Sequence, residues 1–119
     1  AAPAPVAFET RARGDGGNGA DVRTRFSYDR VLGTLGYEVE ITGVPADDVL
    51  AVVLRHADEE GRRYVAARLS GPGADTSAGT LTLRGDMRAR LEGGGLILEL
   101  MTRSAPFGAA RARIVPTAP

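Results

Sequence analysis

The chain of 119 residues has room for one domain with one hydrophobic core. It contains no cysteine, which excludes disulfides and thiolate chemistry, and its formal net charge of zero creates no global field that would attract nucleic acid or an anionic membrane. No apolar run approaches the roughly 18 residues of a membrane-spanning helix, so we expect no membrane span.

The first five residues, Ala-Ala-Pro-Ala-Pro, contain two prolines, which cannot start a hydrogen-bonded strand. We expect an extended leader there. Small residues at the start of a chain without an initiator methionine are typical of a mature end left by signal-peptide cleavage, although a trimmed chain would begin in the same way. The sequence therefore predicts a secreted or periplasmic protein whose signal peptide has been removed.

Strand patterns follow one another along most of the chain. Apolar and polar residues alternate with period two over residues 6–13, 21–29 and 36–44, which predicts strands with one buried face. Residues 49–54 are continuously apolar, as is typical of a strand buried on both faces. Further strands are predicted over residues 63–69, 79–84, 96–101 and 110–115, and the last two form a closing hairpin.

Residues 86–92 are the one predicted helix. Asp86 can cap its start, Met87 and Leu91 lie at positions i and i+4, and Gly93 ends it. About eight strands with one short helix predict an all-β fold, an antiparallel Greek-key-like sandwich or barrel. We expect one domain over residues 1–119, with 1–5 flexible and 116–119 frayed.

The closing strand suggests a polar binding face. Alternation places Arg111 and Arg113 on one side of the strand and its small apolar residues on the other. We therefore regard Arg111, Arg113 and the nearby Glu99 as candidate binding residues. The alternative is a solvated outer face on which these arginines are interleaved with Glu38, Glu40 and Glu99.

His56 is the only histidine, so the chain alone cannot assemble the imidazole cluster that Zn²⁺ or Cu²⁺ prefers. We expect it at a strand end, hydrogen-bonded to a carbonyl, and we keep it as a tentative binding residue. A metal or small-ligand role would combine His56 with turn carboxylates, because Ca²⁺ takes six to eight oxygen ligands. Those carboxylates belong to Asp47, Asp48, Asp58 and Glu59.

No nucleophile or general base stands beside His56 in the sequence, so we expect no enzyme activity. Gly93, Gly94 and Gly95 do not make a phosphate loop, because the Walker lysine is missing. We therefore expect no cofactor, and we expect no nucleic-acid partner.

Several blocks resemble the chordin-type (CHRD) domain, over roughly residues 21–114. Residues 37–44, Tyr-Glu-Val-Glu-Ile-Thr-Gly-Val, are similar to the family strand that ends in Gly-Leu. Residues 77–81, Ser-Ala-Gly-Thr-Leu, resemble its Ser-Gly-Thr strand, and 91–96 resemble its Leu-x-x-Gly step. The closing block, 96–114, keeps the family spacing at Thr102, Pro106, Gly108, Arg111 and Ile114.

The departures from the family pattern fall on polar positions. Of the family's His-x-His pair only the second remains, as His56, and the first is Leu54. The histidine of the closing strand is Met101, and the glutamate after the turn is Ala109. The family's Gln-Glu-Val-Pro-Pro segment has no counterpart. The chain thus resembles a divergent bacterial-type member that lacks most of the family's histidines.

Chordin-type domains bind proteins outside the cell in chordin, so the resemblance implies a non-catalytic secreted interaction module. An exposed strand edge would serve for a protein partner or for self-association. Two alternatives remain open. One is the metal-ion or small-ligand role just described, and the other is a structural domain of a surface assembly.

Overall fold

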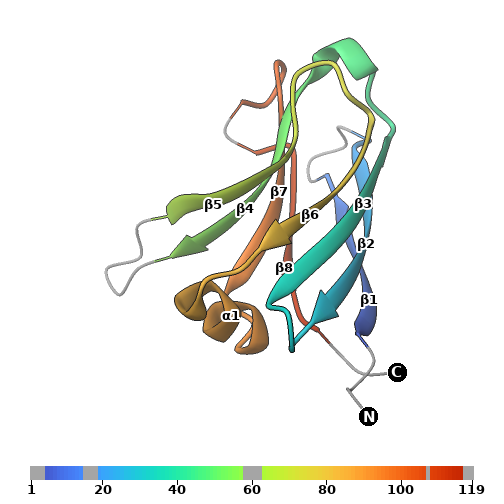
Figure 1. The fold of residues 1–119 in the computed structure, drawn as a ribbon. Coiled ribbons are helices and arrows are strands. Elements are labelled where there is room, and N and C mark those ends of the chain that lie inside the picture. The colour runs from blue at the N-terminus through green and yellow to red at the C-terminus, as the bar shows by residue number, and fades with distance from the viewer. Residues whose placement is uncertain (1–4, 15–18, 58–62, 107, 117–119) are drawn as a thin grey trace.

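The computed structural model describes residues 5–14, 19–57, 63–106 and 108–116. They form two four-stranded antiparallel sheets that face each other as a β-sandwich (Figure 1). The first sheet has the order β1-β2-β3-β6, and the second has the order β5-β4-β7-β8. The strands are β1 (Val6–Arg13), β2 (Asp21–Asp29), β3 (Thr34–Thr42), β4 (Val49–Ala57), β5 (Arg63–Ser70), β6 (Thr76–Thr82), β7 (Leu96–Thr102) and β8 (Ala110–Ile114). The predicted all-β sandwich of about eight strands is confirmed.

The core lies between the two sheets and follows from the period-two pattern. In β2, the side chains of Val22, Thr24, Phe26 and Tyr28 are buried, while the residues between them are exposed. Phe26 stacks on Phe8 of β1 with 5.0 Å between ring centroids. Because neighbouring strands of this sheet pair without a register shift, the buried residues of each strand lie beside those of the next, and the polar residues share the outer face.

Strand β4 is buried on both faces, as its apolar run predicts. Val52 and Leu54 belong to the core between the sheets, whereas Ala51 and Val53 are buried on the opposite face of the second sheet. The centre of the outer face of the second sheet is therefore buried, whereas the outer face of the first sheet is solvated.

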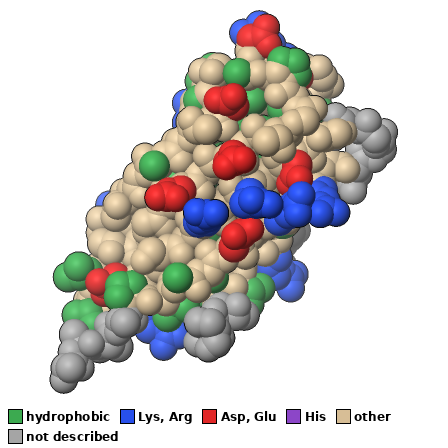
Figure 2. All heavy atoms as spheres, turned by 90° about the vertical axis from the view of Figure 1, so that its right-hand side faces the viewer, with side chains coloured by type: hydrophobic (Ala, Val, Ile, Leu, Met, Phe, Trp, Pro, Cys, Tyr) green, Lys and Arg blue, Asp and Glu red, His purple; other side chains and the backbone are tan. Residues whose placement is uncertain are grey.

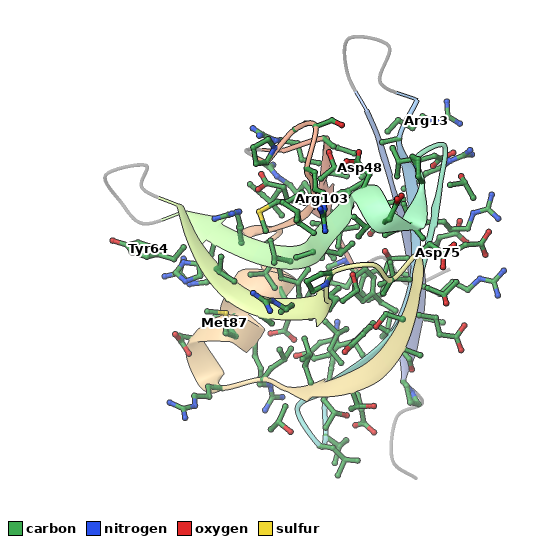
Figure 3. All side chains as sticks on the ribbon, turned by 90° about the horizontal axis from the view of Figure 1, so that it is seen from above. Arg13, Asp48, Tyr64, Asp75, Met87 and Arg103 are labelled. Carbon is green, nitrogen blue, oxygen red and sulfur yellow. The ribbon has the colours of Figure 1, made fainter. Side chains whose placement is uncertain are left out.

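The two lateral sides of the sandwich differ. On one side β1 lies along β8, and Gly14 forms a bridge with Ala110, which closes that side. On the other side the chain crosses from β5 to β6, where the Ser77 hydroxyl donates a hydrogen bond to the Leu69 carbonyl at 2.6 Å. Beyond this crossing β5 and β6 diverge (Figures 1 and 3). Strand β6 thus ends the first sheet as an open edge.

Two short helical elements connect the strands. A 3-10 helix, η1 (Ala46–Asp48), precedes β4, and α1 (Gly85–Glu92) precedes β7. Leu91 is buried and Met87 packs on the core, as the i, i+4 pattern predicts.

The predicted cap of α1 is wrong. Asp86 lies inside the first turn, and the N-cap is the extended Arg84, which makes no side-chain capping hydrogen bond. An N-cap residue must have non-helical backbone angles, and Asp86 is already helical. The helix does end before Gly93, but the left-handed residue that reverses the chain is Gly94, with φ of 74°.

Candidate functional site: the open edge of β6

The structure brings together two of the predicted binding residues, Glu99 and Arg111. Arg111 lies with Nη2 3.4 Å from Glu99 Oε2, and Arg55 of β4 donates from Nε to Glu99 Oε1 at 2.7 Å. Only 3% of the Glu99 side chain is exposed. The expectation of a solvated Glu99 among surface arginines is therefore wrong, because a carboxylate so deeply buried requires charged partners. The cluster of Arg55, Glu99 and Arg111 links β4, β7 and β8.

Sequence reasoning missed Arg55, although a signal was present. Arg55 interrupts the apolar run of β4, and Glu99 interrupts the apolar run of β7 in the same way. Charged residues that break two buried strands are expected to pair with each other. In the structure Arg55 also donates to the Met101 sulfur at 3.3 Å.

Arg113 and His56 lie apart from this cluster. Arg113 is exposed on β8 and makes no ion pair with any residue that the structure describes. His56 pairs with Leu96, three positions from Glu99 along β7, so the two side chains belong to opposite faces of the sheet. Its ring centroid is 5.5 Å from that of Tyr64. No hydrogen bond joins His56 to a carbonyl of the described residues, and its buried Nδ1 has no partner among them.

The turn carboxylates proposed as metal ligands are only partly described. Asp48 accepts a hydrogen bond from the Ser104 hydroxyl at 3.1 Å, and its carbonyl accepts one from the Arg103 N–H at 2.8 Å, so these loops meet above the sandwich (Figure 3). Asp58 and Glu59 lie outside the described residues. Within the described ranges, no three His, Asp or Glu side chains converge to hold a metal ion.

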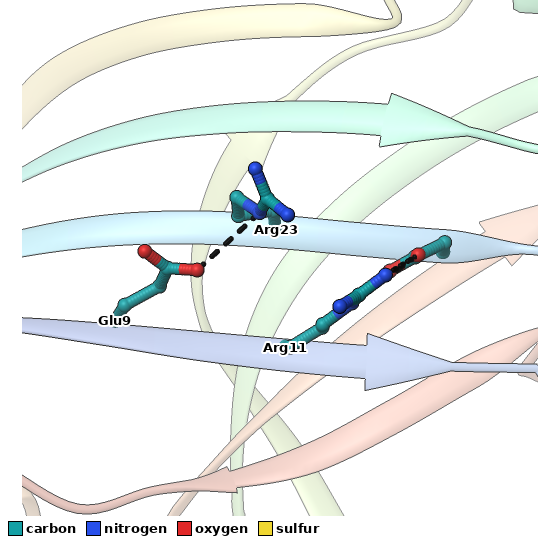
Figure 4. A network of polar contacts seen from close by, with 4 residues as sticks. Glu9, Arg11 and Arg23 are labelled. Carbon is teal, nitrogen blue, oxygen red and sulfur yellow. Dashed lines mark hydrogen bonds and ion pairs between the residues drawn. The ribbon is translucent and has the colours of Figure 1, made fainter.

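Arginine and carboxylate side chains gather on the outer face of the first sheet (Figure 2). Arg11 and Asp21 form a two-point contact across β1 and β2, with 3.0 Å from Nε to Oδ1 and 2.5 Å from Nη2 to Oδ2, and Arg23 approaches Glu9 at 3.3 Å (Figure 4). The hydrogen bond from Arg11 is the main reason that the pKa of the Asp21 carboxyl is lowered, with burial opposing it. These ion pairs join β1 to β2 and do not include Glu38 or Glu40 of β3.

Strand β6, Thr-Ser-Ala-Gly-Thr-Leu-Thr, differs from the other three edge strands. It contains no charged residue and no proline, and it pairs with β3 in one unbroken register from Glu40–Thr76 to Thr34–Thr82. Proteins usually protect edges with charges, prolines or bulges. The other edges show such protection: β1 and β8 carry exposed arginines, and β5 is bulged against β4. The β6 edge is therefore the unprotected one.

The direction of the β6 backbone groups follows from two hydrogen bonds at its ends. Ile41 N donates to Asp75 O at 2.8 Å, and Leu83 N donates to Gly33 O at 2.7 Å. Both belong to hydrogen-bonded pairs of the antiparallel ladder, and such pairs recur at every second residue. Residues 77, 79 and 81 therefore bond β3, while Thr76, Ala78, Thr80 and Thr82 direct N–H and C=O away from it, towards the open edge.

A shallow depression of about 550 Å³ adjoins this edge on the outer face of the first sheet. Its floor consists of the small residues Ser27, Gly36, Ala78 and Thr80. The larger side chains of Arg25 and Glu38 also line it. A second hollow, of about 170 Å³, continues the depression past Glu38 to Glu40 and Thr76. The small side chains of Thr76 and Ala78 thus lie between the open edge and the carboxylates of Glu40 and Glu38 on β3.

No family model, no curated protein and no solved structure matches the chain. The resemblance to chordin-type domains therefore stays a prediction. Within the described residues, no helix is long and apolar enough to cross a membrane.

Proposed function

We propose that the chain is a non-catalytic interaction module that binds an extended segment by strand addition along β6. The supporting observation is the unprotected edge: β6 directs alternate backbone N–H and C=O groups outward and carries no charge, proline or bulge to block a further strand. The added segment belongs to a protein partner or to another copy. The resemblance to secreted chordin-type domains agrees with this role and with a location outside the cytoplasm.

Strand addition needs a receiving strand that is already held in place. Strand β6 is held along one edge by the backbone hydrogen bonds to β3, and near its start by the Ser77–Leu69 hydrogen bond. Because the receiving backbone is ordered before binding, the conformational entropy lost on association falls mainly on the incoming segment.

A proline at residue 78 tests this function. Ala78 directs its N–H away from β3, so Ala78→Pro removes an outward donor and no bond of the β3–β6 ladder. The matched control is Ala7→Pro. Gly14 N donates to Ala20 O at 2.7 Å, so the same alternation leaves the Ala7 N–H outside the β1–β2 ladder, on the opposite edge of the same sheet.

Two measurements complete the test: the mass by light scattering over a range of protein concentrations, and titration with short blocked peptides that alternate threonine and valine. We expect association in at least one of them, its loss in Ala78→Pro and its retention in Ala7→Pro. A chain that remains monomeric and binds no peptide would contradict the proposal. Equal effects of the two prolines would contradict the assignment to β6.

A further inference from the structure

The chemistry of the segment that β6 accepts is set by the row of residues behind the edge. Glu38 lies directly across from Ala78, and Glu40 lies directly across from Thr76, all on the outer face. Both glutamates are exposed, and neither forms an ion pair with any residue that the structure describes. They are the two charged residues of β3, the strand next to β6.

An added strand would lie about 4.8 Å beyond β6 and about twice that distance from β3. Because Ala78 and Thr76 are small, an arginine or lysine on the outer face of the added strand can extend over them. Together with a glutamate side chain of β3, it spans the two strand spacings. Arg25 and Arg23 face the same carboxylates from β2, and Arg23 is already 3.3 Å from Glu9. These arginines lie one strand further away, beyond the reach of an incoming acidic side chain.

The spacing also fits. Glu38 and Glu40 are two residues apart on one strand, about 7 Å, which is the separation of side chains at positions i and i+2 of an incoming strand. On the inner side of β6, Leu81 is partly buried against the core, and Tyr37 lies over Gly79. Side chains at the alternate positions of the incoming strand would meet this apolar border.

Resting on the proposed strand addition, we infer that the partner is an extended segment of another protein in which basic residues alternate with apolar ones. The basic residues at i and i+2 pair with Glu38 and Glu40, and the apolar residues contact the border beside Leu81. Pairing of β6 with the β6 of a second copy fits less well, because that strand brings no cation to either carboxylate. The formal net charge of zero makes the preference local to these residues.

The test uses three short blocked peptides in which valine alternates with arginine, with glutamine or with glutamate, titrated against the whole chain at low salt. We expect the arginine peptide to bind about three- to tenfold more tightly than the glutamine peptide, and the glutamate peptide to bind least, as two exposed ion pairs allow. The difference should shrink as salt is added. The double variant Glu38→Gln with Glu40→Gln should equalise the arginine and glutamine peptides.

The control Asp47→Asn removes an exposed carboxylate of η1 that lies outside the β3–β6 ladder, and it should leave the preference unchanged. If all three peptides bind equally and Ala78→Pro abolishes their binding, the edge function stands and the basic partner is overturned. If Asp47→Asn weakens the binding of the arginine peptide as much as the double variant does, the inference also falls. If no peptide binds, the basic partner and strand addition of peptides at β6 both fall.

Discussion

Arg55 on β4 donates a hydrogen bond of 2.7 Å to Glu99 on the neighbouring β7, where only 3% of the Glu99 side chain is exposed. The two residues are 44 positions apart in the chain. Their contact joins the two central strands of the second sheet on its outer face. The stability of that sheet should therefore depend on keeping both charges or removing both.

We expect Arg55→Ala to lower the free energy of unfolding by about 3 kcal/mol, because it leaves the Glu99 carboxylate buried with its best partner removed. Arg111→Ala should cost less, about 1 kcal/mol, since 42% of the Arg111 side chain is exposed. The joint replacement Arg55→Met with Glu99→Leu should recover most of the loss. Urea unfolding measures all three variants, and a joint variant as unstable as Arg55→Ala would disprove the pairing argument.

The close approach of two loops should make Gly43 irreplaceable. Gly43 has φ of 82°, and a Cβ placed on it would lie 1.7 Å from the Gly19 carbonyl oxygen. Gly43→Ala should therefore cost more than about 4 kcal/mol or abolish folding. Gly73 has a similar φ of 76° but open space around it, so Gly73→Ala should cost only about 1–2 kcal/mol. Thermal melts of the two variants compare steric clash with backbone strain, and equal losses would refute the clash.

A buried hydroxyl on β2 should be dispensable. Thr24 is fully buried, and its Oγ1 has no hydrogen-bond partner among the described residues. Thr24→Val removes this unsatisfied group and should stabilise the fold by about 1 kcal/mol. In contrast, Thr102 Oγ1 accepts a hydrogen bond from Ala105 N at 2.9 Å, so Thr102→Val should destabilise it. Chemical denaturation decides the sign for each, and a loss of stability in Thr24→Val would indicate that its hydroxyl is satisfied in solution.

The Arg11–Asp21 pair should give a pH-dependent contribution to stability. Because the pKa of Asp21 is lowered in the folded chain, mainly by the Arg11 hydrogen bond, its contribution is present above the unfolded-state pKa and is lost as pH falls through the folded-state pKa. Arg11→Gln should raise the pKa of Asp21, followed by NMR titration of its carboxyl carbon. Arg25→Gln is the control on the same face, and an equal rise there would implicate the general field instead of this contact.

Part of this fold could be predicted from the local pattern of apolar and polar residues in the sequence. The alternation of β2 identified Val22 and Tyr28 as core residues, and the unbroken apolar run identified β4 as buried on both faces. The cap of α1 was misplaced because Asp86 and Arg84 are two residues apart, a shift that a capping motif alone does not resolve.

The site depended on information that no local pattern holds. The burial of Glu99 follows from the pairing of β4 with β7, and the open edge follows from which strand ends the first sheet. In β6, the residues from Thr76 to Ala78 carry too weak an alternation to be recognised as strand. The absence of charge that makes β6 a good receiving edge also makes it a poor signal in the sequence.

The closed side formed by β1 and β8 governs how the domain can be tethered. These strands are antiparallel, with Gly14 beside Ala110, so β1 begins and β8 ends at the same pole of the sandwich. β1 forms one edge of its sheet and β6 forms the other, so a linker, a surface anchor or a neighbouring domain joined next to β1 or β8 would emerge along the flank remote from β6. Tandem copies on one polypeptide would then each present a receptive border without obstructing the next, so that avidity would grow with copy number.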